Sequence, residues 1–221
     1  MANRKSEVQL ALALDPAAVL PRVQKNINTA LLVATWNVNS IRARLDLVVG
    51  WLDRERPDVV FLQETKVTDD LFPMEPFKRL GCEVAYFGQR QYNGVAILSR
   101  SSIAEPSFEL STFCDREARM IVATILGIRM VNVYAPNAVS TADARFTQKV
   151  RWLKALAGYI EGQRDRHEEL LLCGDFNVIP FDFDAHDVSF WLYRTFVHAD
   201  VRKALSNVTC ERLVDLPKPS I

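Results

Sequence analysis

The sequence has little of several features that identify common classes of protein. Its four cysteines are widely spaced and form no Cys-x-x-Cys pair, so the sequence indicates neither a zinc site nor a disulfide framework. No apolar run approaches the ~20 residues of a membrane-spanning helix. An excess of one charge is also lacking, because 27 basic residues balance 27 acidic ones, and DNA binding would therefore require a local groove of positive charge. We expect a protein of a reducing compartment, in the cytoplasm, without a membrane segment.

The composition fits one globular domain. With 221 residues, 49% of them hydrophobic, the chain is long enough for one sizeable core and short for two. The apolar run from Val8 to Leu14 fits a strand or a helix, and it is too short for a signal peptide. We therefore treat residues 1–29 as an N-terminal extension, which is either docked on the domain or a poorly ordered arm, and residues 30–221 as the domain.

Short runs of apolar and β-branched residues predict strands, and apolar residues at helical spacing predict helices. The predicted strands cover residues 30–36, 58–62, 83–87, 94–99, 120–125, 128–134 and 170–173, and the predicted helices cover residues 41–52, 147–163 and 199–205. Ser40 is the predicted N-cap of the first helix, and Gly127 supplies the positive φ of a hairpin turn. Strands and helices alternate, and the hairpins among them make the predicted sheet mixed.

Polar residues follow four of these strands, at the ends where α/β proteins place their chemistry. They are Asn39, Glu64, Tyr134 and the pair Asp175 and Asn177. Residues two apart on an extended chain point the same way, so Asp175 and Asn177 are expected to share a direction. Structural alternatives remain open: a turn bonded to its own backbone for the Asn and Asp residues, a helix-start carboxylate for Glu64 and a strand-end aromatic for Tyr134.

Meeting at one edge of a sheet, these side chains would offer hard oxygen ligands without a cysteine or histidine pair. Such ligands suit Mg²⁺ or Mn²⁺ rather than Zn²⁺. Magnesium needs few protein ligands, because water and substrate phosphates complete its coordination. A cation of this kind polarises a phosphate oxygen and stabilises the leaving oxygen. The residues therefore point to phosphoester hydrolysis.

Five segments carry motifs that follow one another along the chain: Trp36–Leu45, Leu62–Lys66, Asn93–Arg100, Asn132–Asn137 and Gly174–Asn177. Together they resemble the exonuclease III family, the abasic-site endonucleases and 3′-exonucleases of the endonuclease/exonuclease/phosphatase superfamily. The resemblance implies a four-layer α/β sandwich, in which two packed mixed sheets carry helices on their outer faces. It further implies magnesium-dependent hydrolysis of double-stranded DNA at abasic sites or 3′ ends, as a monomer.

The resemblance also assigns roles to individual residues. Glu64 would be the main metal ligand, with Asn39 close to the metal and Asp175 and Asn177 completing the site. Tyr134 would contact the scissile phosphate, Asp175 would orient the water or protonate the leaving group, and Asn177 would hold the phosphate. The residues expected to bind DNA are Asn137 and Lys149, at positions that touch the DNA backbone, and Arg42, in the groove.

The sequence departs from the family's pattern in its last part. The family's late aspartate motif and its terminal Ser-Asp-His motif have no counterpart here, and His186, the histidine nearest the site in sequence, lies where the family has no base. We therefore expect a domain that lacks its C-terminal strands, with impaired activity, because the loss of a positioned acid or base costs ~10²–10⁴ in rate. The alternatives are a phosphatase of the same superfamily that acts on a small phosphoester, and an inactive fragment.

Overall fold

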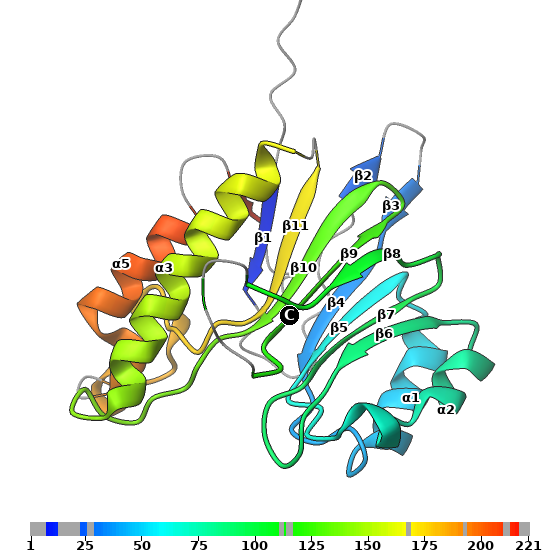
Figure 1. Ribbon diagram of the computed structural model, residues 1–221, viewed down its shortest axis with the longest axis horizontal. Coiled ribbons are helices and arrows are strands. Elements are labelled where there is room, and N and C mark those ends of the chain that lie inside the picture. The colour runs from blue at the N-terminus through cyan, green and yellow to red at the C-terminus, as the bar shows by residue number, and fades with distance from the viewer. Residues whose placement is uncertain are drawn as a thin grey trace, which may run out of the picture.

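The computed structural model describes residues 8–12, 23–25, 29–110, 113, 117–166, 169–191, 194–209 and 213–216. Two sheets pack face to face in the middle of the molecule (Figure 1). The larger has the strand order β12-β1-β11-β10-β9-β8 and the smaller the order β4-β5-β7-β6. The bounds of the larger sheet are β1 Val8–Leu12, β8 Ala104–Ser107, β9 Met120–Ile125, β10 Ile128–Tyr134, β11 Leu170–Asp175 and β12 Leu213–Asp215. Those of the smaller sheet are β4 Val33–Asn37, β5 Val59–Gln63, β6 Glu83–Phe87 and β7 Val95–Ser99.

Helices cover the outer face of each sheet, with α3 and α5 on one side of the molecule and α1 and α2 on the other (Figure 1). The four-layer α/β sandwich predicted from the resemblance is therefore confirmed. Among the described residues, no helix is long and apolar enough to cross a membrane. The helix bounds are α1 Leu45–Glu55, α2 Met74–Arg79, α3 Ala144–Arg164, α4 Val188–Trp191 and α5 Ala199–Thr209, and a separate hairpin pairs β2 (Val23–Lys25) with β3 (Thr29–Leu31).

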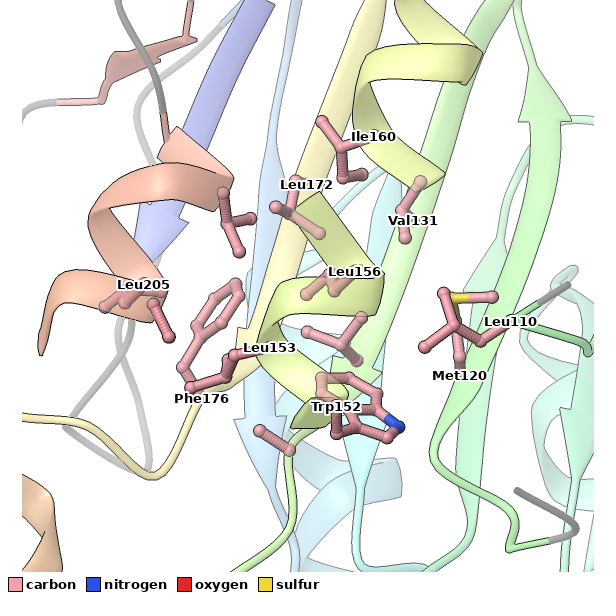
Figure 2. Packing of buried hydrophobic residues seen from close by; sticks show 14 of the residues in the cluster. Leu110, Met120, Val131, Trp152, Leu153, Leu156, Ile160, Leu172, Phe176 and Leu205 are labelled. Carbon is pink, nitrogen blue, oxygen red and sulfur yellow. The ribbon is translucent and has the colours of Figure 1, made fainter. Parts of the chain in front are cut away.

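The predicted amphipathic pattern of α3 places its apolar side on the larger sheet. Trp152, Leu153 and Leu156 are at most 1% exposed, and they pack with Leu172 of β11 and Leu205 of α5 (Figure 2). A fully buried side chain of this size contributes about 1.5–3 kcal/mol. This layer fixes β11, the strand whose end carries Asp175.

A second core lies between the sheets, and it contains a polar residue. Asn132 of β10 is fully buried, and its Nδ2 donates to the backbone oxygens of Leu62 and Ala96, at 3.0 and 2.9 Å, in the smaller sheet. Its Oδ1 accepts from Gln63 Nε2 at 2.8 Å, and the same nitrogen donates to Thr35 Oγ1. Buried polar groups of this kind are stable only when their bonds are made, so Asn132 fixes how the two sheets align.

The start of α1 differs from the prediction. Helix α1 begins at Leu45 with Arg44 at the N-cap position, and Ser40 has φ +90°, so the predicted N-cap at Ser40 is wrong. The residues between them form a turn in which Ser40 Oγ accepts from Ala43 N. The apolar spacing still holds, because Ile41 belongs to the same buried cluster as the apolar side of α1.

Part of the N-terminal extension joins the larger sheet. Strand β1 pairs in parallel with β11 on one side and with β12 on the other, and Leu12 is in register with Gly174. Along these residues β11 is therefore an interior strand, with both rows of backbone groups paired.

Candidate active site

The strands that end in polar residues bring those ends together. Strand β4 runs parallel to β5, and β10 runs parallel to β11, with Tyr134 in register with Asp175. Strand β11 also lies against β4 and β5 of the other sheet. The carboxyl ends of these four strands therefore meet at one edge of the sandwich, as predicted for the polar strand ends.

Asn37 joins the two carboxylates of this site. Its Nδ2 donates to Glu64 Oε1 and to Asp175 Oδ2, each at 2.8 Å. The two carboxylate oxygens are therefore separated by no more than twice 2.8 Å, although Glu64 follows a strand of the smaller sheet and Asp175 ends a strand of the larger. The amide oxygen of Asn37 is occupied locally, since it accepts from Asn39 N at 3.1 Å.

Glu64 is held as an anion. Burial raises the pKa of its carboxyl, but hydrogen bonds from Asn37, Lys66 and Tyr134 and the nearby Lys66 charge outweigh burial, so the pKa lies below its usual value. The Lys66 Nζ is 2.7 Å from Glu64 Oε2. An ionised, partly buried carboxylate at a strand end is a suitable ligand for a hard cation.

Tyr134 stands beside the Glu64 carboxylate and donates a hydrogen bond to it. The residue is 8% exposed, and burial together with the negative charge of Glu64 raises the pKa of its hydroxyl. Behind the ring, the guanidinium carbon of Arg119 lies 5.4 Å from the ring centroid. Tyr134 is therefore a fixed, protonated hydrogen-bond donor at the site.

Asp175 and Asn177 form a turn as well as part of the site. Asp175 Oδ1 accepts from Asn177 N at 2.9 Å, while Oδ2 faces Asn37. Asn177 has φ +51°, so the alternation of an extended strand does not set its direction. Burial and the Glu64 charge raise the pKa of Asp175 more than its hydrogen bonds and Lys149 lower it. The turn interpretation of Asp175 is therefore confirmed by Oδ1, whereas its role as a functional carboxylate stays a prediction that the contact of Oδ2 with Asn37 allows.

Gly174 allows two neighbouring strands to pack closely. It lies inside β11 with φ +139°, and a Cβ at this position would come 2.0 Å from the backbone oxygen of Val133. Glycine lets β11 approach β10 closely, which brings Asp175 beside Tyr134.

Lys149, expected to touch the DNA backbone, lies inside the protein. Its side chain is fully buried, its Nζ donates to the backbone oxygen of Asn177, and the same nitrogen lies 4.7 Å from the centroid of the Phe196 ring. Burial lowers its pKa to about 8, although the charge of Asp175 opposes that shift. Through this hydrogen bond, Lys149 supports the turn at Asn177 from inside the protein.

The remaining predicted residues lie on the surface. Asn39, Arg42 and Asn137 are exposed. Of these, Asn39 is tied to the site, because its Oδ1 accepts from Lys66 Nζ and Lys66 in turn contacts Glu64. His186 is exposed as well.

Sequence reasoning missed Asn37, Lys66 and Arg119 as members of this cluster. Asn37 ends β4 and Asn39 lies two residues beyond it, so a period-two pattern read from the sequence alone gives both the same direction. From the sequence, either Asn37 or Asn39 could therefore be the residue that contacts the carboxylates of the site. No sequence signal identified Arg119, because its contact with Tyr134 depends on the pairing of β9 with β10.

The donor set fits a hard divalent cation. Two carboxylates converge on one amide nitrogen at equal distances, an arrangement in which a cation could bind both in place of that nitrogen. Among the described residues there is no group of three or more His, Cys, Asp or Glu side chains that could hold a metal. With two carboxylates as protein ligands, a bound Mg²⁺ would keep several water or substrate ligands, as magnesium usually does.

Comparisons with known proteins agree with this geometry. Residues 34–207 match the Endonuclease/Exonuclease/phosphatase family. An AP endonuclease from Archaeoglobus fulgidus is 37% identical, with a TM-score of 0.76 over 80% of this chain and 68% of that one. The 3′ phosphatase NExo from Neisseria, solved bound to a product DNA hairpin, is 36% identical, with a TM-score of 0.79 over 81% and 70%.

Exodeoxyribonuclease III from Haemophilus influenzae is 33% identical over 159 residues, which cover 68% of this chain and 58% of that protein. The chain thus spans less than two thirds of the length of this relative. The family match, the relatives and the fold all agree with the resemblance found in the sequence. The chain belongs to the endonuclease/exonuclease/phosphatase family and, within it, to the exonuclease III type.

Proposed function

We propose that the chain is a magnesium-dependent phosphodiester hydrolase that acts on DNA, of the exodeoxyribonuclease III or abasic-site endonuclease type, in DNA base excision repair. The observation that carries the proposal is the convergence of Glu64 and Asp175 on Asn37 beside Tyr134. The substrate is double-stranded DNA with abasic sites or 3′ ends, and the chain acts as a monomer.

Metal dependence is general among nucleases of this family, and Mg²⁺ or Mn²⁺ suits the oxygen ligands of this site. Glu64 and Asp175 would hold the ion, with Asn39 and Asn177 at its margin. An ion held there would supply polarisation of a phosphate oxygen and stabilisation of the charge on the leaving oxygen.

Side chains of the protein supply the hydrogen bonds to the substrate and transfer the protons. The Tyr134 hydroxyl is kept protonated by burial and by Glu64, and on substrate binding it would exchange its hydrogen bond to Glu64 for one to a non-bridging phosphate oxygen. Asp175, whose pKa is raised by burial, takes a proton from the attacking water or gives one to the leaving oxygen, as a general acid or base does. Asn177 holds the phosphate, and its turn is supported by the bond from Lys149.

Exposed residues around this edge supply the contacts with DNA. Arg42 and Asn137 are accessible, and an arginine or an amide side chain can bond phosphate oxygens. Since the chain has no net charge, such local contacts have to provide the attraction for DNA.

The proposal is tested by nicking of an end-labelled duplex that carries one abasic site. We expect cleavage in Mg²⁺, none in EDTA, and a rate at least ~10²-fold lower for Glu64→Gln, because the ligand charge is lost without a change in size. Glu55→Gln is the matched control, since Glu55 is a surface residue at the end of α1. Equal rates for the unmodified chain and Glu64→Gln would contradict the proposal.

Removal of a 3′-phosphate is a second candidate activity, favoured by the similarity to NExo. A duplex with a 3′-phosphate at a nick separates the two activities, because phosphatase action releases inorganic phosphate and leaves strand length unchanged. Inositol phosphate in parallel assays tests a small phosphoester as the substrate. A chain that is folded by circular dichroism and acts on none of these substrates would be an inactive fragment.

A further inference from the structure

The segment that follows the candidate active site carries two aromatic side chains on the surface. Phe181 and Phe183 are 55% and 83% exposed, and Phe183 has the largest exposed fraction among the large apolar side chains that the structure describes. Their rings stack, with centroids 5.1 Å apart and planes 10° from parallel. The exposed rings form a flat apolar face. Because exposed apolar surface is unfavourable in water, a ligand that covers this face would gain binding free energy.

The loop that presents the pair is held in place by α5. Arg202 donates from Nε to the backbone oxygen of Ile179 at 2.9 Å and from NH2 to Asp182 Oδ1 at 2.8 Å. Within the loop, the 3-10 turn η2 (Asp182–Asp184) is closed by a bond from Phe181 N to Asp184 Oδ2. Because the backbone is fixed on both sides of the rings, binding here would cost little ordering of the loop.

The pair also lies close to the site along the chain. Phe181 is four residues beyond Asn177, and a fully extended chain spans at most ~3.3–3.6 Å per residue. The Cα atoms of Phe181 and Asn177 are therefore no more than about 14 Å apart, so a strand whose phosphate lies at Asn177 has its neighbouring nucleotides within reach of Phe181 and Phe183.

We propose that Phe181 and Phe183 form a stacking subsite for an unpaired nucleobase next to the phosphate that is cleaved. This inference rests on the proposed DNA hydrolysis. A base offers a flat π-face that stacks on aromatic rings independently of sequence. The acidic side chain between the rings is paired with Arg202, which suits an uncharged base. Two Phe rings are also too small for a stable protein interface, which needs ~800 Å² from each partner.

The test compares two DNA ligands that differ only in the presence of bases. One is a duplex with a 3′ overhang of thymidines, and the other is the same duplex with an overhang of abasic nucleotides. Fluorescence anisotropy is measured with Glu64→Gln, which is expected to slow cleavage at least ~10²-fold, alone and combined with Phe183→Ala, Phe183→Trp or Leu47→Ala. Leu47 is a control because it is 60% exposed on α1.

We expect Phe183→Ala to weaken binding of the thymidine overhang about 5- to 150-fold, the range that corresponds to ~1–3 kcal/mol per stacked base. Binding of the abasic overhang is expected to stay unchanged. Phe183→Trp retains binding because it keeps a flat ring, and Leu47→Ala has no effect. An equal effect of Phe183→Ala on both ligands, or no effect on either, would overturn the subsite while cleavage by the unmodified chain upholds the proposed function. A chain that neither cleaves nor binds DNA would overturn both.

Discussion

Replacing Asn37 with alanine removes the amide nitrogen that Glu64 and Asp175 share. Both lost hydrogen bonds go to carboxylates at 2.8 Å, and such bonds contribute ~1.5–3 kcal/mol each. The lower value applies because the residues are partly exposed and water can enter the space. We therefore expect the free energy of unfolding in EDTA to fall by about 3 kcal/mol, which corresponds to a melting temperature roughly 6–12 °C lower.

Magnesium should reduce this loss. A cation bound to Glu64 and Asp175 neutralises the same carboxylates, and it binds more tightly where no amide competes. By linkage, the stabilisation by excess Mg²⁺ should be larger for Asn37→Ala than for the unmodified chain. The measurement is thermal unfolding of both proteins in EDTA and in Mg²⁺.

Asn39→Ala is the matched control, because Asn39 is exposed and its side chain contacts Lys66. Its expected cost in EDTA is below ~1 kcal/mol. An Asn37→Ala variant as stable as the unmodified chain in EDTA, or one destabilised equally with and without Mg²⁺, would refute the reasoning.

Three further predictions concern the surroundings of the site. Asn132→Leu should lower the free energy of unfolding by at least ~3 kcal/mol, measured by urea denaturation, because Gln63 Nε2 and two buried carbonyl oxygens each lose a partner; a loss below ~1 kcal/mol would contradict the role of Asn132 between the sheets. Gly174→Ala should cost at least ~2 kcal/mol and reduce nicking, since its Cβ would meet Val133 at 2.0 Å, and unchanged stability would show that β10 and β11 can separate there. Lys149 has a pKa of about 8 in the folded chain against 10.5 for the free group, so the unfolded chain binds more protons between these two pH values. The stability contributed by this group therefore rises with pH across that window, by about 3 kcal/mol. In EDTA the stability of the unmodified chain relative to Lys149→Met should increase from pH 7 to pH 10.5, and a difference that does not change with pH would contradict the buried ammonium.

Most of the fold was predictable because its strands are continuous apolar runs. Strands β6, β9 and β10 have the predicted bounds. Strand β8 was not predicted, because it is short, exposed and contains Pro106, features that strand patterns exclude. Its position depends on pairing with β9, and pairing of this kind leaves no periodic signal in the sequence.

For the site, the sequence identified which strand ends meet but not which atoms touch. Glu64, Tyr134 and Asp175 were expected at one place, and they lie there because parallel strands of two sheets end together. The bridging role of Asn37 and the burial of Lys149 depend on rotamers and on α3 packing, and neither is encoded in motif spacing. The roles assigned to these residues in binding and catalysis stay predictions until the variants are measured.

Each half of the site belongs to one continuous stretch of chain. The smaller sheet uses residues 33–99 and supplies Asn37 and Glu64, whereas the strands that supply Tyr134 and Asp175 come after residue 104. A polypeptide cut between Arg100 and Ala104 would thus carry half of the carboxylate pair on each piece. Such a pair of fragments would act as a split reporter, in which metal-dependent nicking returns only when the two pieces reassociate.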